Sequence, residues 1–190
     1  MKLHRAAVLG LLPVTFALSA CIPSPTPPVD PESCRGTLGA VRVEKVIVPL
    51  GATCTLDGTL VDGTVEVERD ATLISRGATI GGNVQATAHR EVRLGASSTV
   101  RGSVQVTQGQ AASVRDSRVI GDLQFDDSTG PLDAQRNLVG GSIQVVGNRG
   151  TSELRDNRVG GNLQCKENLP APTGGGNVVE GTKEDQCRLL

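Results

Sequence analysis

Cysteine is the residue type with the most specific chemistry in this chain of 190 residues. Cys21 lies near the N-terminus, and the others are Cys34, Cys54, Cys165 and Cys187. In an exported chain, four cysteines beyond the leader favour two disulfides and an oxidising compartment. Four cysteines allow three pairings, so the pairing depends on the elements that position them.

Residues suited to catalysis are scarce. The only histidine after the first 20 residues is His89, and its charged neighbours predict a solvated bend. No nucleophile is paired with a base in a recognisable pattern. The best acidic candidates are Asp122, Asp126 and Asp127, with Arg101 nearby in the repeats. The Asp pair precedes Ser-Thr-Gly-Pro and is typical of a turn, so we predict no catalytic residue, no metal site and no cofactor.

A short sequence motif, here called the phrase, recurs along the chain. Its repeats form the elements that position these residues. Its clearest copies are VGGNLQC (159–165) and VGGSIQV (139–145). Successive copies are 19 or 20 residues apart, as their marker glycines show: Gly63, Gly82, Gly102, Gly121, Gly141, Gly161 and Gly181. A fixed period of about 20 residues is the signature of a solenoid.

The phrase alternates apolar and polar residues, which is the period of a β-strand. Around Gly141, for example, Val139, Ile143 and Val145 are the expected inward residues. Each repeat offers about three short strands, and stacked repeats can pair them in parallel. A β-sandwich does not keep its register over six steps, and the glycines exclude helical repeats. We therefore predict an all-β parallel β-helix of about seven coils, roughly 34 Å long.

The cysteine spacing matches one coil at each end of this solenoid. Cys34 and Cys54 are 20 residues apart, and Cys165 and Cys187 are 22 apart. Adjacent rungs are roughly 4.8 Å apart, within reach of a disulfide. We therefore expect the bonds Cys34–Cys54 and Cys165–Cys187 as caps, although Cys165 also occupies a core position where it could remain a free apolar residue.

Two further series of residues follow the period. Asn137, Asn157 and Asn177, with Ser117 one step earlier, are expected at turns with stacked amides, and an Asn-lined ligand groove is the alternative. The second series is expected to face solvent on one sheet, either for solubility or to bind a sugar chain: Glu66, Gln85, Gln105, Gln124, Gln144 and Gln164.

Residues 1–20 are predicted to be a secretory signal, with Lys2 and Arg5 before an apolar stretch too short to span a membrane. Its end, Leu18-Ser19-Ala20-Cys21, resembles the lipobox of bacterial lipoproteins. That resemblance implies cleavage before Cys21, a diacylglyceryl group on its thiol and an acyl chain such as palmitate on its new N-terminus. Ordinary secretion is the alternative. Residues 21–33, rich in proline, are predicted to form a tether to the domain at 34–190.

The tail GNLQCKENLPAPTGGGNVVEGTKEDQC (161–187) resembles a group of uncharacterised secreted bacterial right-handed parallel β-helix proteins. The repeats and the segment CTLDG (54–58) also match, so the resemblance covers most of 34–187. It implies export and a right-handed coil, and it implies no activity.

Composition narrows the function further. The net charge is −1, and removal of Lys2 and Arg5 with the signal makes it −3, without a basic patch that would predict nucleic-acid binding. We expect an exported protein, anchored to the cell envelope through the lipid on Cys21, that is a non-catalytic structural or interaction module with a glycan or protein partner. The alternative is a carbohydrate-active enzyme, a polysaccharide lyase or hydrolase. End-to-end assembly of the solenoid into a filament is a third alternative, which the capping cysteines disfavour.

Overall fold

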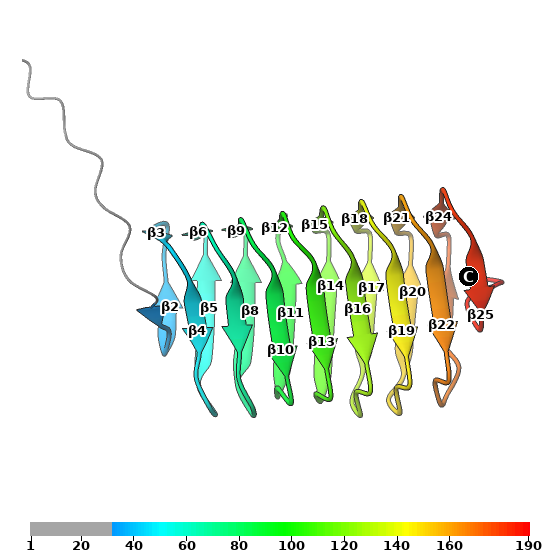
Figure 1. Ribbon diagram of the computed structural model, residues 1–190, viewed down its shortest axis with the longest axis horizontal. Helices are drawn as coiled ribbons and strands as arrows, with labels where there is room; N and C mark the ends of the chain where they lie inside the picture. The colour runs from blue at the N-terminus through cyan, green and yellow to red at the C-terminus, as the bar shows by residue number, and fades with distance from the viewer. Residues whose placement is uncertain (1–31) are drawn as a thin grey trace, which may run out of the picture.

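A computed structural model describes residues 32–190, which form a β-solenoid of about eight turns (Figure 1). All strand pairs are parallel, and the described residues contain no helix. The predicted fold class is confirmed. The extra turn comes from the N-terminal coil, where Glu44 takes the place that a marker glycine holds in the next coil. The predicted signal peptide, Cys21 and most of the tether lie outside the described residues.

Each coil contributes one strand to each of three sheets, here called A, B and C. Sheet A contains β1 (Glu32–Ser33), β4 (Val46–Val48), β7 (Val65–Val67), β10 (Val84–Thr87), β13 (Val104–Thr107), β16 (Leu123–Asp126), β19 (Ile143–Val146), β22 (Leu163–Lys166) and β25 (Lys183–Asp185). Sheet B contains β2 (Gly36–Leu38), β5 (Thr53–Asp57), β8 (Thr72–Arg76), β11 (Glu91–Gly95), β14 (Ala111–Arg115), β17 (Leu132–Gln135), β20 (Ser152–Arg155) and β23 (Thr173–Gly175). Sheet C contains β3 (Arg42–Val43), β6 (Leu60–Val61), β9 (Thr79–Ile80), β12 (Thr99–Val100), β15 (Arg118–Val119), β18 (Leu138–Val139), β21 (Arg158–Val159) and β24 (Val178–Val179).

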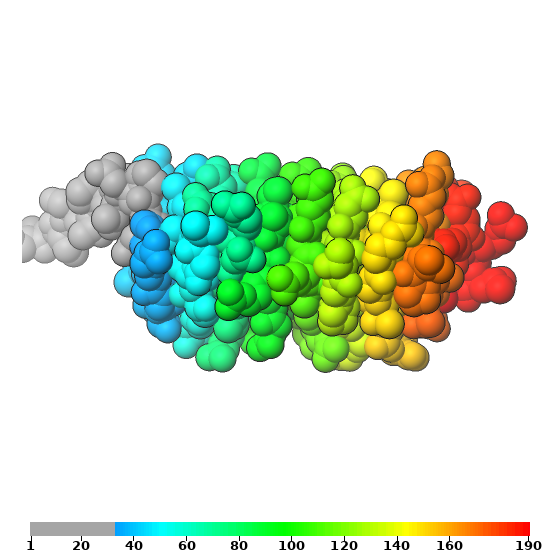
Figure 2. All heavy atoms as spheres, turned by 90° about the horizontal axis from the view of Figure 1, so that it is seen from below, coloured from blue at the N-terminus to red at the C-terminus, as the bar shows by residue number. Residues whose placement is uncertain are grey.

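The coil is right-handed. In Figure 1 the chain descends through sheet A on the near side, rises through sheet B on the far side and advances towards the C-terminus. The phrase strands form sheet A, and the weaker strands between phrases form sheet B. The space-filling view shows successive coils as bands along an elongated rod (Figure 2). Each coil therefore contacts mainly its two neighbours, as in other solenoids.

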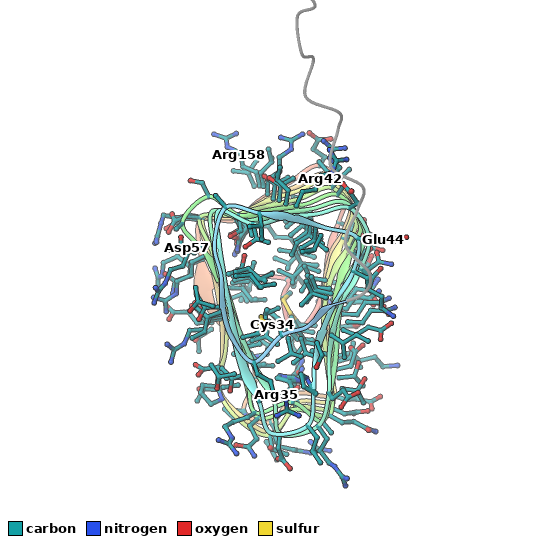
Figure 3. All side chains as sticks on the ribbon, turned by 90° about the vertical axis from the view of Figure 1, so that its left-hand side faces the viewer. Cys34, Arg35, Arg42, Glu44, Asp57 and Arg158 are labelled. Atoms are coloured by element: carbon teal, nitrogen blue, oxygen red, sulfur yellow. A yellow bond between two sulfur atoms is a disulfide. The ribbon has the colours of Figure 1, made fainter. Side chains whose placement is uncertain are left out.

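The core is a thin stack of aliphatic side chains enclosed by the three sheets (Figure 3). The predicted inward positions are confirmed: Val139, Ile143 and Val145 have at most 1% of their surface exposed. In-register pairing places like residues above one another, for instance Ile143 between Leu123 and Leu163. Within residues 32–190, Phe125 is the only Phe, Tyr or Trp residue, and it lies in this core. Small and branched side chains fill the interior because neighbouring coils are only about 4.8 Å apart.

The marker glycines recur because they stack on one another where sheet C turns into sheet A. A Cβ atom on Gly82 would lie 2.7 Å from the backbone carbon of Gly63, and one on Gly161 would lie 2.9 Å from that of Gly141. Hydrogen bonds join the same backbones, with Gly161 N donating to Gly141 O at 2.8 Å. A side chain would force neighbouring coils apart at this corner, so the period of the sequence has a steric cause.

Both predicted disulfides are confirmed, with Cα–Cα distances of 5.5 Å for Cys34–Cys54 and 5.1 Å for Cys165–Cys187. The register differs from our expectation, because neither bond joins ladder partners. Cys54 pairs in register with Gly36, and Cys165 pairs with Asp185. Each bond therefore reaches a residue two positions away from the stacked one. Cβ atoms stacked at about 4.8 Å are slightly too far apart for a disulfide, whose Cβ atoms are usually about 3.8 Å apart.

The N-terminal boundary also differs slightly from the prediction. β1 begins at Glu32, two residues before the expected start of the domain, because Glu32 and Ser33 pair with Val46 and Ile47. The next residue, Cys34, continues this edge by donating its N–H to Ile47 O at 2.8 Å. Strand pairing therefore begins within residues that the sequence assigned to the tether.

Candidate functional site

The acidic residues that an enzyme would need are separated in the structure. Asp122 precedes β16 in the turn from sheet C, whereas Asp126 is the last residue of β16. Four strand residues span roughly 13 Å, which exceeds the spacing of about 5–10 Å between the carboxylates of glycosidases. Arg101 occupies the corresponding turn one coil earlier, at the end of sheet A that lies far from Asp126. The structure therefore does not bring these four candidates together.

Asp122 belongs to a chain of hydrogen bonds that ties the turns together. Its Oδ1 atom accepts a bond from Ser142 N at 2.8 Å, and its own N–H donates to Ser103 Oγ at 3.0 Å. The same side-chain-to-backbone bond recurs at the residue after each marker glycine, through Thr64, Asn83, Ser103, Asp122, Ser142, Asn162 and Thr182. Asp122 thus satisfies backbone donors in a structural series.

Asp126 and Asp127 form the predicted turn at the corner between sheets A and B. Asp127 adopts a left-handed conformation with φ of 50°, which Asp tolerates better than most residues. Partial burial raises the pKa of Asp126, and the neighbouring charge of Asp127 raises it further. No group of three or more His, Cys, Asp or Glu residues within 32–190 is arranged to hold a metal ion.

The predicted stacking of Asn137, Asn157 and Asn177 is confirmed, but these residues line the interior. Asn157 Nδ2 donates to Asn177 Oδ1 at 2.9 Å and to Ala134 O at 2.8 Å. All three side chains are buried, which excludes the Asn-lined surface groove. The left-handed residues of this corner are the preceding ones, Asp116, Arg136, Asp156 and Gly176, so the asparagines act by capping backbone groups that the turn leaves unpaired.

A second buried asparagine ladder, which our sequence analysis missed, lies at the corner between sheets A and B. Asn148 Nδ2 donates to Asn168 Oδ1 at 2.9 Å and to Phe125 O at 2.8 Å. Ser128 begins this ladder, and Gln186 ends it. Asn148 and Asn168 are 20 residues apart, the same spacing that revealed the first ladder. The 20-residue spacing was therefore visible in the sequence, but only two asparagines show it.

The expectation that His89 lies in a solvated bend is wrong. Its side chain is fully buried at the corner between sheets A and B, in the column that contains Ser128 and Asn148 in later coils. Glycine at position 109 makes room for it, because a Cβ atom there would overlap the imidazole ring. Neither ring nitrogen has a hydrogen-bond partner among the described residues. Burial lowers the pKa of His89 by disfavouring the charged ring.

The lowered pKa of His89 predicts a loss of stability in mild acid. Below the unfolded-state pKa of about 6.5, the unfolded chain binds a proton that the folded chain does not, so the free energy of unfolding falls as the pH decreases below about 6.5. His89→Asn introduces the residue found at this corner in Asn148 and Asn168, and the variant should show a flatter profile. Urea unfolding at several pH values measures the free energy of unfolding of the wild type and of the variant. The same dependence on pH in both proteins would contradict the prediction.

The outward glutamine row on sheet A is confirmed. Gln85, Gln105, Gln124, Gln144 and Gln164 pair in register, with Glu66 at one end and Glu184 at the other. Gln85 Nε2 donates to Gln105 Oε1 at 3.3 Å, and Gln164 Nε2 donates to Glu184 Oε2 at 3.1 Å. The row is therefore a continuous band of amide donors and acceptors on the outer surface.

Comparison with known proteins assigns no family to this chain. The sequence matches no protein-family model, and it matches no curated protein and no solved structure. The resemblance of residues 161–187 to secreted β-helix proteins therefore stays a prediction. Within the described part of the chain, no helix has the length and apolar character needed to cross a membrane.

Proposed function

We propose that this protein is exported, anchored to a bacterial membrane through a lipid on Cys21, and displays its solenoid as a non-catalytic structural or interaction module at the cell surface. The domain would sit at the end of the proline-rich tether, whose ten residues 22–31 before β1 could span roughly 31 Å in the polyproline conformation. The partner would be a glycan or a protein, and no nucleic acid is involved.

The observation that carries the proposal is how the solenoid uses its polar residues. The two asparagine ladders and the turn series engage side chains with backbone groups of the next coil. Asp122, the first acidic candidate for catalysis, is one of these side chains. What remains on the outside is a set of regular rows, such as the glutamines of sheet A. Regular flat surfaces on a rigid rod suit binding or spacing, and solenoids commonly use such extended surfaces for binding.

The compartment has separate support. The bonds Cys34–Cys54 and Cys165–Cys187 are consistent with a location outside the cytoplasm. The lipobox-like Leu18-Ser19-Ala20-Cys21 supports anchoring, because two or three acyl chains hold a protein on a membrane more stably than a single chain.

Replacing the lipidated cysteine tests the anchor. Cys21→Ser should move the protein from the membrane fraction to the soluble or secreted fraction, because the thiol that would receive the diacylglyceryl group is lost. Ser24→Ala in the tether serves as the control and should stay with the membranes. Fractionation followed by immunoblotting measures the distribution. Partition of Cys21→Ser with membranes at the wild-type level would refute the anchor.

The non-catalytic part of the proposal has its own test. The folded domain is incubated with a panel of cell-wall and extracellular glycans, and both binding and cleavage are followed. Binding without turnover supports an interaction module. Turnover of any glycan would establish the enzyme instead.

A further inference from the structure

Sheet B carries a hollow of about 480 Å³ on its outer face, lined by Ile74, Arg76, Arg93, Gly95, Ser113 and Arg115. These residues belong to β8, β11 and β14 in three successive coils. Two outward rows meet there. Ile74, Arg93 and Ser113 pair in register in the first row, and Arg76 pairs with Gly95 in the second.

The hollow exists because a side chain is missing from the second row. Gly95 stands between Arg76 in the previous coil and Arg115 in the next one. Its backbone is not left-handed, and a Cβ atom there would lie no closer than 3.9 Å to its nearest neighbour, Arg115 O. A larger residue would therefore fit, so neither turn geometry nor close packing explains this glycine.

An inserted residue shapes one wall. Residues 95–97 separate buried Leu94 from buried Ser98, whereas only two residues separate Val114 from Ser117 in the next coil. Ala96 and Ser97 are both left-handed, with φ of 51° and 63°. This conformation is unfavourable for alanine, and backbone strain of this kind concentrates at functional positions. The insertion therefore coincides with the missing side chain.

Three guanidinium groups surround this space. Arg76 and Arg115 are two rungs apart, roughly 9.6 Å, and Arg93 lies two residues before Gly95 on the same strand. Arg93 Nε donates to Glu91 Oε1 at 2.5 Å, and Arg115 Nε donates to Asp133 Oδ2. Within residues 32–190 the terminal nitrogens of both arginines have no hydrogen-bond partner, and Arg76 forms no ion pair.

An arginine elsewhere in the solenoid provides a comparison, because the donors of its guanidinium group are used within the protein. Arg136 donates through both Nε and Nη2 to Asp116, at 2.7 and 2.8 Å, so its fork is used within the protein. Around the hollow the acids bind only the Nε side of Arg93 and Arg115, which leaves their forks available. Asp133 cannot easily take more, because Ser113 Oγ and Gln135 Nε2 also donate to it, at 2.9 and 2.6 Å.

We propose that this arginine hollow, formed by Arg76, Arg93 and Arg115 around Gly95, is a binding site for an acidic glycan, a linear chain of carboxylate-bearing sugars. Guanidinium forks bind carboxylates in a planar, bidentate manner. The ligand lies along the solenoid axis, so that carboxylates reach Arg76 and Arg115 on either side of Gly95 while a sugar ring fills the gap. Ile74 offers an apolar surface for the C–H groups of the ring.

The size of the hollow favours a glycan over an acidic protein. Its volume is in the range of about 300–1,000 Å³ typical of small-ligand sites, whereas a stable protein partner would bury about 800 Å² on each side. The rungs also repeat regularly, which suits a ligand that is itself an extended regular polymer. The inference rests on the proposed role as an interaction module and names its ligand and site.

The test is isothermal titration calorimetry on the full chain in mild detergent at low ionic strength. The probes are an oligogalacturonate, a neutral cello-oligosaccharide of equal length and an oligoglutamate of equal length. The oligogalacturonate should bind and the other two should not, and its affinity should fall as salt is added. Arg76→Gln and Arg115→Gln should each weaken binding about tenfold, the effect of losing one charged hydrogen bond.

Two further variants separate the hollow from general charge. Gly95→Thr fills the gap without changing charge, and it should abolish binding while leaving the melting temperature unchanged or higher, because threonine favours strands. Arg155→Gln removes an arginine of sheet B that pairs with Glu153 through Nε in the same way, at 3.1 Å, but does not line the hollow. Its affinity should stay within about twofold of wild type.

Several results would overturn the proposal. They are no binding of the oligogalacturonate, equal binding of the neutral chain or of oligoglutamate, and wild-type affinity in Gly95→Thr or Arg76→Gln. These outcomes are distinct from failure of the anchor. If Cys21→Ser releases the protein but the oligogalacturonate does not bind, only the hollow is refuted. If the oligogalacturonate binds but Cys21→Ser remains on membranes, only the anchor is refuted.

Discussion

Ile143→Asp is expected to abolish cooperative folding of the solenoid. Ile143 is fully buried in β19, between Leu123 of the previous coil and Leu163 of the next. An aspartate there would place an unpaired charge between two buried leucines, which costs more than about 4 kcal/mol in the usual range of severe core mutations. A domain of this size has only about 5–15 kcal/mol of net stability. Thermal unfolding followed by circular dichroism should show no cooperative transition.

The matched control is the same substitution one residue further along. Gln144 points outward in the glutamine row, with Gln124 and Gln164 on either side. Gln144→Asp should cost at most about 1 kcal/mol, the range of strand propensity. Equal damage from the two variants would show that the inward and outward assignments of sheet A are wrong.

Reduction of the two disulfides should lower the melting temperature substantially. Each bond closes a loop of about one coil, 20 residues for Cys34–Cys54 and 22 for Cys165–Cys187. The chain-entropy model assigns about 3 kcal/mol to a loop of this length. The bonds join residues that are not ladder partners, so they add constraints that strand pairing does not supply. Calorimetry with and without reductant measures the effect.

Loosening should begin at the two ends of the rod, because a stack of coils is stabilised mainly through nearest neighbours. Hydrogen exchange of the reduced protein should rise first in residues 34–60 and 165–187, while residues 100–145 remain protected. The double variant Cys165→Ser/Cys187→Ser provides the control and should expose only the C-terminal end. Uniform exchange along the solenoid would contradict the capping role, as would a disulfide-linked peptide joining Cys54 to Cys165 in the oxidised protein.

Much of this fold could be predicted from the sequence because the residue patterns that determine it are periodic and local. Alternation of apolar and polar residues assigns each side chain of a strand to the inside or the outside, and the marker glycines set the register between coils. Val139, Ile143 and Val145 were identified in this way, as were the glutamine row and the stacking of Asn157 on Asn177. The cysteine spacing then sufficed to pair Cys34 with Cys54 and Cys165 with Cys187. The eighth turn escaped the same reasoning because it lacks the glycine.

Only the tertiary structure decided what lies beside each residue in the neighbouring coil. His89 looks like a solvated residue in its own segment, and it is buried because Gly109, one coil away, leaves room for its ring. Gly95 has no distinctive role in its own segment, and it opens a hollow because Arg76 and Arg115 flank it from two other coils. Local pattern determines which way a side chain points. Its environment depends on which residues the neighbouring coils place beside it, and only the three-dimensional stacking shows these neighbours.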